Sequence, residues 1–451
     1  MKLFVIVATR QKIANLPPVL ELAEPGDEML WLVSDEAQEQ CWADKPRELL
    51  RRRGLNTWQL VRLKNINNLS EMAEKLRPIV AQIPDRQYTQ VYLVLNGGKK
   101  FTPIGVFEAF RTLQPTLLYG AADRAGYVLD DGHPQTLPIV RPYRQAQLDL
   151  EEIFWLNDYQ RFKSDQWEKL WPGPLPALAA KQQYGQHEQY TYELHQRHHR
   201  YADVKERSRR ISIEDLVQAV TFNNLPQLVS QGSLARWHKA LSRLIECDNE
   251  DQRRGVFHAT LNLIESAALG LQLERDREQF PSATIGSALE YAVARRVHAW
   301  PEAHRHAAIY SIWMGIMVAP ASRPDSAHAE YDVLLVLTNG VLINLECKAA
   351  QVSSKDLDSR LLRLRQISSR TSRTLVVMPC FTRCQQEPWF LDLHRARIQV
   401  EQSLGPDSWL PFTWPEQPSR YTVYHQGEQQ TFDCPTFEER LTQLLAAYVP
   451  R

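Results

Sequence analysis

Several features that would place this sequence in a common class of protein are missing. Lysine plus arginine and aspartate plus glutamate number 53 each, so there is no net charge and a globally basic nucleic-acid binder is excluded, although local basic patches are not. The six cysteines include no C-x-x-C pair, which favours reduced thiols over a zinc site or a disulfide framework. No apolar run reaches membrane-spanning length, and Lys2 opens a short strand rather than a signal peptide. We therefore expect a cytoplasmic protein without membrane segments, divided into two or three domains.

The most informative segment that is present covers residues 330–348. Its sequence is EYDVLLVLTNGVLINLECK, two apolar runs joined by Asn339-Gly340, which is a strong signal for a β-hairpin. Asp332 lies on the first arm, and the second arm ends in Glu346-Cys347-Lys348. Two carboxylates beside an amine are suited to binding Mg²⁺ or Mn²⁺ and to orienting a water molecule. The alternative is a hairpin whose charges are simply solvated at its end.

The length of the turn decides which side chains share a face. A two-residue loop would pair Asp332 with Cys347 and leave Glu346 and Lys348 on the opposite face, because side chains alternate along a strand. A three-residue loop, Thr338-Asn339-Gly340 with left-handed glycine, places Asp332 opposite Glu346 and Lys348 on the same face. The other face is then entirely apolar: Val333, Leu335, Leu337, Val341, Ile343 and Leu345. Packing and chemistry therefore both favour the three-residue loop.

A third carboxylate precedes the hairpin. Residues 284–297 have an apolar residue at every fourth position from 285 onwards, which predicts an amphipathic helix with Thr284 as its N-cap and Glu290 beside the apolar stripe. After the hairpin, residues 355–373 predict a crossover helix that leads to a buried strand at 374–378.

The helical Glu290, then Asp332, then Glu346-x-Lys348 resemble the motif of the PD-(D/E)XK nuclease superfamily. The likeness covers roughly residues 275–400 and departs from the usual Pro-Asp, because Tyr331 precedes the aspartate. It implies that Glu290, Asp332, Glu346 and the main-chain carbonyl of Cys347 bind Mn²⁺ or Mg²⁺, and that Lys348 assists the attacking water.

The first third of the chain alternates apolar runs with helical segments, which predicts a parallel, Rossmann-like sheet. Ligands bind such sheets beyond the carboxyl ends of the strands, where the loops carry Thr9, Arg10, Gln11, Lys12, Ser34, Asn96, Gly97, Gly98 and Lys99. The glycines permit close approach of a ligand and the lysines suit phosphate, although N-G-G could be only a turn. No G-x-G-x-x-G follows the first strand, which disfavours a dinucleotide cofactor.

The polar residues 9–11 after the first strand and the N-G-G-K at 96–99 resemble the ligand motifs of a CARF domain, a sensor of cyclic oligoadenylates. A CARF domain with a PD-(D/E)XK domain resembles the ancillary nucleases of type III CRISPR systems. The resemblance implies an α/β homodimer activated by cyclic tetra-adenylate, less often the hexa-adenylate, that cuts DNA or RNA. We expect a sensor at residues 1–145, a mainly helical connector at 146–274 and a nuclease domain with a carboxyl-terminal extension at 275–451.

Two other functions are compatible with parts of the pattern. A nucleotide-sensing regulator could bind DNA without cutting it, but it would not need the Asp332, Glu346 and Lys348 combination. An enzyme acting on a small phosphorylated metabolite is disfavoured, because the amino-terminal loops carry no Ser/His/Asp or Cys/His set.

Overall fold

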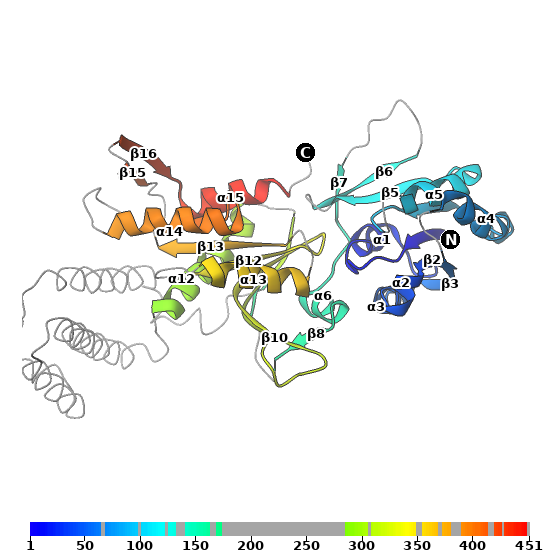
Figure 1. The fold of residues 1–451 in the computed structure, drawn as a ribbon, viewed down its shortest axis with the longest axis horizontal. Helices are drawn as coiled ribbons and strands as arrows, with labels where there is room; N and C mark the ends of the chain where they lie inside the picture. Colours follow the sequence, from blue (N-terminus) through cyan, green and yellow to red (C-terminus); the bar gives the residue numbers. More distant parts are fainter. Residues whose placement is uncertain are drawn as a thin grey trace, which may run out of the picture.

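The computed structural model describes residues 1–64, 68–97, 101–121, 125–131, 140–162, 168–173, 285–304, 308–348, 354–368, 372–379, 389–413, 419–425 and 428–448. Figure 1 shows two α/β halves lying side by side, each built on its own sheet, with the amino-terminal half in blue and cyan. The expected α/β class is confirmed. Gly98, Lys99, the predicted N-cap Thr284 and most of the predicted connector lie outside the described residues.

The amino-terminal sheet has seven strands in the order β3-β2-β1-β4-β5-β6-β7. They are β1 (Lys2–Val7), β2 (Glu28–Ser34), β3 (Asn56–Leu63), β4 (Gln90–Val94), β5 (Thr116–Ala121), β6 (Gly126–Asp130) and β7 (Val140–Pro142). The first five strands in the chain pair in parallel, and β6 and β7 are antiparallel. Residues 132–139, between β6 and β7, lie outside the described residues.

Helices cover both faces of this sheet, which explains why its central strands are continuous apolar runs. The helices are α1 (Leu16–Leu22), α2 (Asp35–Glu39), α3 (Asp44–Arg52), α4 (Leu69–Val80), α5 (Phe101–Phe110) and α6 (Leu150–Leu156), with 3-10 turns η1 (Pro84–Arg86) and η2 (Arg111–Leu113). Alternate residues of β1 point to opposite faces. Phe4 and Ile6 pack with α1 and α3, whereas Leu3 and Val5 pack with α4 and α5.

The second sheet follows the order β14-β13-β12-β11-β10-β8, and β9 also pairs with β10. Its strands are β8 (Tyr159–Arg161), β9 (Glu168–Trp171), β10 (Ile309–Pro320), β11 (Ala329–Leu337), β12 (Leu342–Cys347), β13 (Arg373–Pro379) and β14 (Trp409–Phe412). Strands β10, β11 and β12 form an antiparallel meander, and β13 and β14 continue in parallel. Residues 159–171, which we placed in the connector range, thus contribute two short strands to this sheet.

The helices of the second half also lie on opposite faces of their sheet. They are α12 (Ile285–His304), α13 (Ser354–Ile367), α14 (Trp389–Leu404) and α15 (Phe437–Ala446), and β15 (Ser419–His425) with β16 (Glu428–Cys434) forms a separate hairpin. One face of β11 and β12 packs with α12 and α15, and the other packs with α13. The expected helix, hairpin, helix and buried strand are all present.

The two halves share one hydrophobic cluster. It contains Ile13, Leu148 and Phe154 from the first half and Val336 and Leu364 from the second. Helix α6 lies at this junction in Figure 1. None of the helices in the described part of the chain is long and apolar enough to cross a membrane.

Candidate active site

The hairpin of β11 and β12 has the register that we expected. Val333 lies opposite Leu345 and Val336 opposite Leu342. Thr338-Asn339-Gly340 forms the three-residue turn, closed by hydrogen bonds of 2.9 Å from Leu337 N to Val341 O and from Gly340 N to Leu337 O. Gly340 has a φ of 76°, the left-handed conformation that this turn requires. The same register continued by one residue places Asp332 opposite Glu346.

Asp332, Glu346 and Lys348 meet at the end of the hairpin away from the turn. Asp332 Oδ2 accepts a hydrogen bond of 2.7 Å from the main-chain N–H of Cys347, which links the two arms. Glu346 is fully buried, and its Oε1 lies 2.7 Å from Nζ of Lys348, whose side chain is 28% exposed. The lysine therefore connects the buried carboxylate to solvent. The Cys347 thiol points to the opposite, apolar face, where it belongs to the cluster around α12 and α15.

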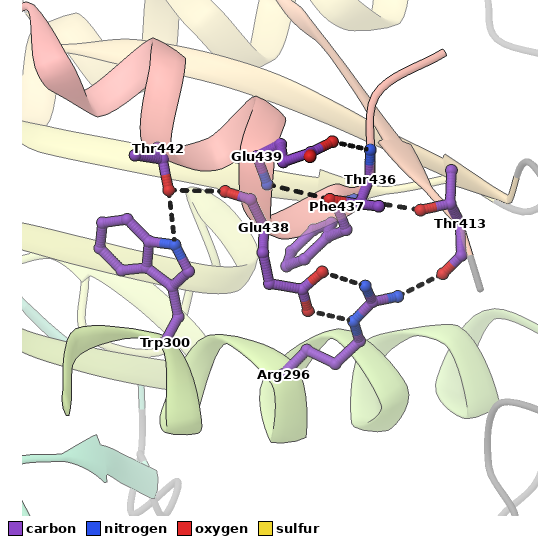
Figure 2. Close-up of polar contacts among 8 residues, drawn as sticks. All are labelled: Arg296, Trp300, Thr413, Thr436, Phe437, Glu438, Glu439 and Thr442. Carbon is purple, nitrogen blue, oxygen red and sulfur yellow. Dashed lines mark hydrogen bonds and ion pairs between the residues drawn. The ribbon is translucent and has the colours of Figure 1, made fainter. Parts of the chain in front are cut away.

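Glu290 lies on α12 and is partly buried. Its helix is attached to the closing helix α15 by polar contacts that Figure 2 shows. The guanidinium of Arg296 pairs with both carboxylate oxygens of Glu438 and donates to Thr413 O, and Trp300 Nε1 donates to Thr442 Oγ1 at 3.1 Å. Arg296 is only 7% exposed and also stacks on two phenylalanine rings, so this contact holds α12 in place against the sheet.

The carboxylates are close enough to perturb one another. Burial raises the pKa of Asp332 to about 8, and the charges of Glu346 and Glu290 add to the effect. Burial also raises the pKa of Glu290, assisted by Glu330 and Glu346. Carboxyl groups with raised pKa values in one place are typical of functional sites, because a stable fold has no need to collect like charges.

Sequence reasoning missed one cation in this group, Arg360 on α13. Its Nη1 lies 2.7 Å from Oε1 and 2.8 Å from Oε2 of Glu346, and 3.3 Å from Glu330 O. The available signal was an arginine in the apolar stripe of the helix, three residues after the buried Leu357 and four before the buried Leu364.

The available donor atoms are oxygens, which hard divalent cations prefer: carboxylates on β11, β12 and α12, and the main-chain carbonyl of Cys347. Within the described residues, no three His, Cys, Asp or Glu side chains are already gathered in metal-binding geometry. Glu346 is instead turned toward Lys348 and Arg360. A metal ion would therefore compete with these two cations for the buried carboxylate.

The second candidate site lies beyond the carboxyl ends of β1, β2 and β4. Thr9 and Gln11 are partly buried and Arg10 is exposed. Lys12 is directed elsewhere, because its Nζ lies 2.8 Å from Oδ2 of Asp158, the residue that precedes β8. On the neighbouring strand, the Ser34 hydroxyl accepts a hydrogen bond of 3.1 Å from Ala37 N and caps α2.

The loop after β4 is held by side-chain contacts with its neighbours. Asn96 donates from Nδ2 to Gly120 O at 2.6 Å and accepts at Oδ1 from Gly120 N at 2.7 Å, so its amide extends the pairing of β4 with β5. A Cβ atom on Gly97 would lie 2.2 Å from Val7 O, so only glycine fits there. Asn15, which sequence reasoning did not select, donates to the same Val7 carbonyl at 2.8 Å.

The two candidate sites are connected through the loop after β1. A Cβ atom on Gly340 would lie 2.7 Å from Cγ2 of Ile13, which shows how closely the hairpin turn approaches this loop. Ile13 is 4% exposed and follows Arg10, Gln11 and Lys12 directly in the chain. Glu346 is six residues from Gly340, or roughly 20 Å along the strand. One hairpin therefore contacts the loop after β1 at its turn and carries the carboxylates at its other end.

No protein-family model matches the sequence, and no curated protein matches it either. Two solved structures match over nearly their whole length. Protein VC1899 from Vibrio cholerae is 13% identical in sequence, with a TM-score of 0.56. The alignment covers 100% of this chain and 99% of VC1899. Can2 from Sulfobacillus thermosulfidooxidans, solved in complex with cyclic tetra-adenylate, is 11% identical, with a TM-score of 0.52. The alignment covers 98% of this chain and 96% of Can2. The chain has the fold of these proteins.

This similarity confirms the expected fold class, a Rossmann-like amino-terminal half followed by a second α/β half. At such low identity it concerns the fold alone. The roles of Asp332, Glu346 and Lys348 depend on the geometry described above.

Proposed function

We propose that this protein is a metal-dependent endonuclease, activated by a cyclic oligoadenylate and acting in type III CRISPR antiviral defence. The observation that carries the proposal is the meeting of Asp332, Glu346 and Lys348 at one end of a hairpin, with Glu290 nearby. The structure of Can2 with cyclic tetra-adenylate supports the choice of activator, because the two folds match from end to end.

In the nuclease half, Glu290, Asp332, Glu346 and the carbonyl of Cys347 would hold Mn²⁺ or Mg²⁺. The ion would supply a Lewis acid beside the scissile phosphate and a bound water of lowered pKa. Lys348 would orient the attacking water, because its amine lies between the buried Glu346 and solvent. Strand pairing on both sides of β12 holds the backbone of Glu346 in place beside Asp332.

In the sensor half, two chains would pair and hold the cyclic nucleotide over the loops at the carboxyl edge of the sheet. Thr9, Arg10 and Gln11 would contact it from one loop, and Gly97, Gly98 and Lys99 from another. The contacts of Ser34 and Asn96 with their own backbone surroundings support a role in shaping these loops. Movement of the β1 loop would reach the nuclease half through Ile13 and the turn at Gly340.

The test is a cleavage panel of single- and double-stranded DNA and RNA with Mn²⁺, with and without cyclic tetra- and hexa-adenylate. Glu346→Gln and Lys348→Ala should each lower cutting by a factor of at least 10² to 10³. Both variants should bind the cyclic nucleotide as the wild type does in calorimetry. Asp358→Asn, on the exposed side of α13, is the control and should cut normally.

Cutting by Glu346→Gln or Lys348→Ala at the wild-type rate would refute the site. Retention of DNA by the wild-type protein without any cutting, under all combinations of metal and activator, would favour the regulator instead.

A further inference from the structure

Helix α13 carries one arginine on its buried side. Leu357, Leu364 and Ile367 are fully buried against the sheet, and Arg360 occupies the position between the first two in the same stripe. At positions spaced three and four apart, these side chains lie on one face of the helix. The exposed Arg365 shows the usual arrangement on this helix, with the charge directed away from the core.

The guanidinium of Arg360 is only partly used by the protein. Within the described residues, the contacts of Arg360 all involve Nη1, which approaches both oxygens of Glu346 and Glu330 O, and the arginine side chain remains 29% exposed. Arginine has five N–H donors in a planar fork. Nε and Nη2 find no hydrogen-bond partner within the described residues, so these donors remain available at the edge of the carboxylate group.

Lys348 already lies 2.7 Å from Glu346 Oε1. Arg360 contacts the same carboxylate as Lys348, so Glu346 already has an ion-pair partner without it, and a second partly buried cation brings a desolvation cost of its own. The second cation is therefore better explained by a negatively charged ligand. A phosphodiester is such a ligand, since its two non-bridging oxygens match the planar fork of arginine.

We propose that Arg360 is a further residue of the nuclease site, and that its N–H groups that do not contact Glu346 bind a non-bridging oxygen of the scissile phosphate. This proposal rests on the proposed function. Arg360 stays protonated throughout and takes no part in proton transfer. It stabilises the charge that accumulates on the phosphate while water attacks the phosphorus atom.

A purely structural arginine would give different results from a phosphate-binding one. If Arg360 only positions Glu346, its loss should weaken metal binding, and the loss of cutting should be recovered at higher metal concentration. If Arg360 binds the phosphate, its loss removes a positive charge beside Glu346, so metal binding should stay equal or become tighter while cutting falls.

The experiment compares the wild type with Arg360→Gln, Arg360→Lys and the control Arg365→Ala. Three quantities are measured: the rate of cutting at saturating Mn²⁺, the affinity for Mn²⁺ by calorimetry without nucleic acid, and the affinity for an oligonucleotide in Ca²⁺. We expect Arg360→Gln to cut at least about 100-fold more slowly and to bind the oligonucleotide more weakly, with Mn²⁺ affinity undiminished. Arg360→Lys keeps the charge without the planar fork, so its cutting rate should lie between those of the wild type and Arg360→Gln. Arg365→Ala should cut at the wild-type rate.

Wild-type cutting by Arg360→Gln would overturn the proposal, as would a parallel loss of cutting and Mn²⁺ affinity. If Arg360→Gln does not fold, Arg360→Lys decides between the same outcomes. If the wild type cuts no substrate, the proposed function fails, and the role of Arg360 is then tested by oligonucleotide affinity alone. Equal affinity of the wild type and Arg360→Gln would overturn the phosphate contact.

Discussion

Asp332→Asn should make the metal-free protein more stable at alkaline pH. The pKa of Asp332 in the folded protein is about 8, against 3.8 for the free carboxyl group, because of burial and the nearby Glu346 and Glu290. Between these two values the folded protein keeps a proton that the unfolded chain has released. Stability therefore falls as the pH rises through this window, and asparagine removes the titrating group that causes the fall.

The size of the effect follows from the linkage of proton binding to folding. One proton difference changes the unfolding equilibrium constant by up to tenfold per pH unit. Glu290, whose pKa is also raised, takes part of the effect, so the gain of the variant over the wild type from pH 5 to pH 8 should be at least about tenfold. If all 451 residues unfold together, this corresponds to roughly 1–2 °C in the thermal midpoint. Lys348 and Arg360 stay near Glu346 in both proteins, so their contribution largely cancels.

Thermal unfolding in EDTA at several pH values measures this difference, with the exposed Asp358→Asn as control. Addition of Mn²⁺ should then raise the midpoint of the wild type and leave that of Asp332→Asn nearly unchanged, because the ion replaces the proton on the wild-type carboxylate. Wild type and Asp332→Asn curves that run parallel across the whole pH range would refute the reasoning.

Three further predictions concern the surroundings of the two sites. Ile13→Ala should leave cyclic-nucleotide affinity unchanged in calorimetry but reduce activation of cutting by roughly 2- to 30-fold, and full activation would contradict the contact with Gly340 as the connection. Arg296→Met should lower the free energy of unfolding by about 1–3 kcal/mol in denaturant titrations, because Glu438 loses its partner. The buried Cys347 thiol, whose pKa is raised by burial, should resist alkylation of the native protein in mass spectrometry.

The hairpin was predictable because its signals are local. Strand alternation and the conformation of one glycine determine which side chains share a face, and both can be read from residues 330–348. The Rossmann-like order of the first half was predictable for a similar reason, since buried parallel strands are continuous apolar runs. The position of Glu290 on a helix was also predictable, because that helix has an unambiguous apolar stripe.

The hydrogen-bond and ion-pair partners of polar side chains were harder to predict from the sequence. Lys12 and Asn96 were selected as ligand residues from their place after a strand, yet one pairs with Asp158 and the other bonds to the backbone of Gly120. Both contacts join positions far apart in the chain. They depend on how loops from different strands come together, which no local pattern contains.

The sequence of one hairpin and one helix was therefore enough to predict which residues, Glu290, Asp332, Glu346 and Lys348, form the candidate site. Their environment could not be predicted in this way. The burial that raises the pKa of Asp332, the approach of Arg360 to Glu346 and the contact of Ile13 with the hairpin turn all arise when α13 and the first half pack onto the second sheet. Strand periodicity acts over neighbouring residues, whereas these contacts join different elements, from 14 residues apart for Arg360 and Glu346 to hundreds for Ile13 and Gly340, and so only the folded chain reveals them.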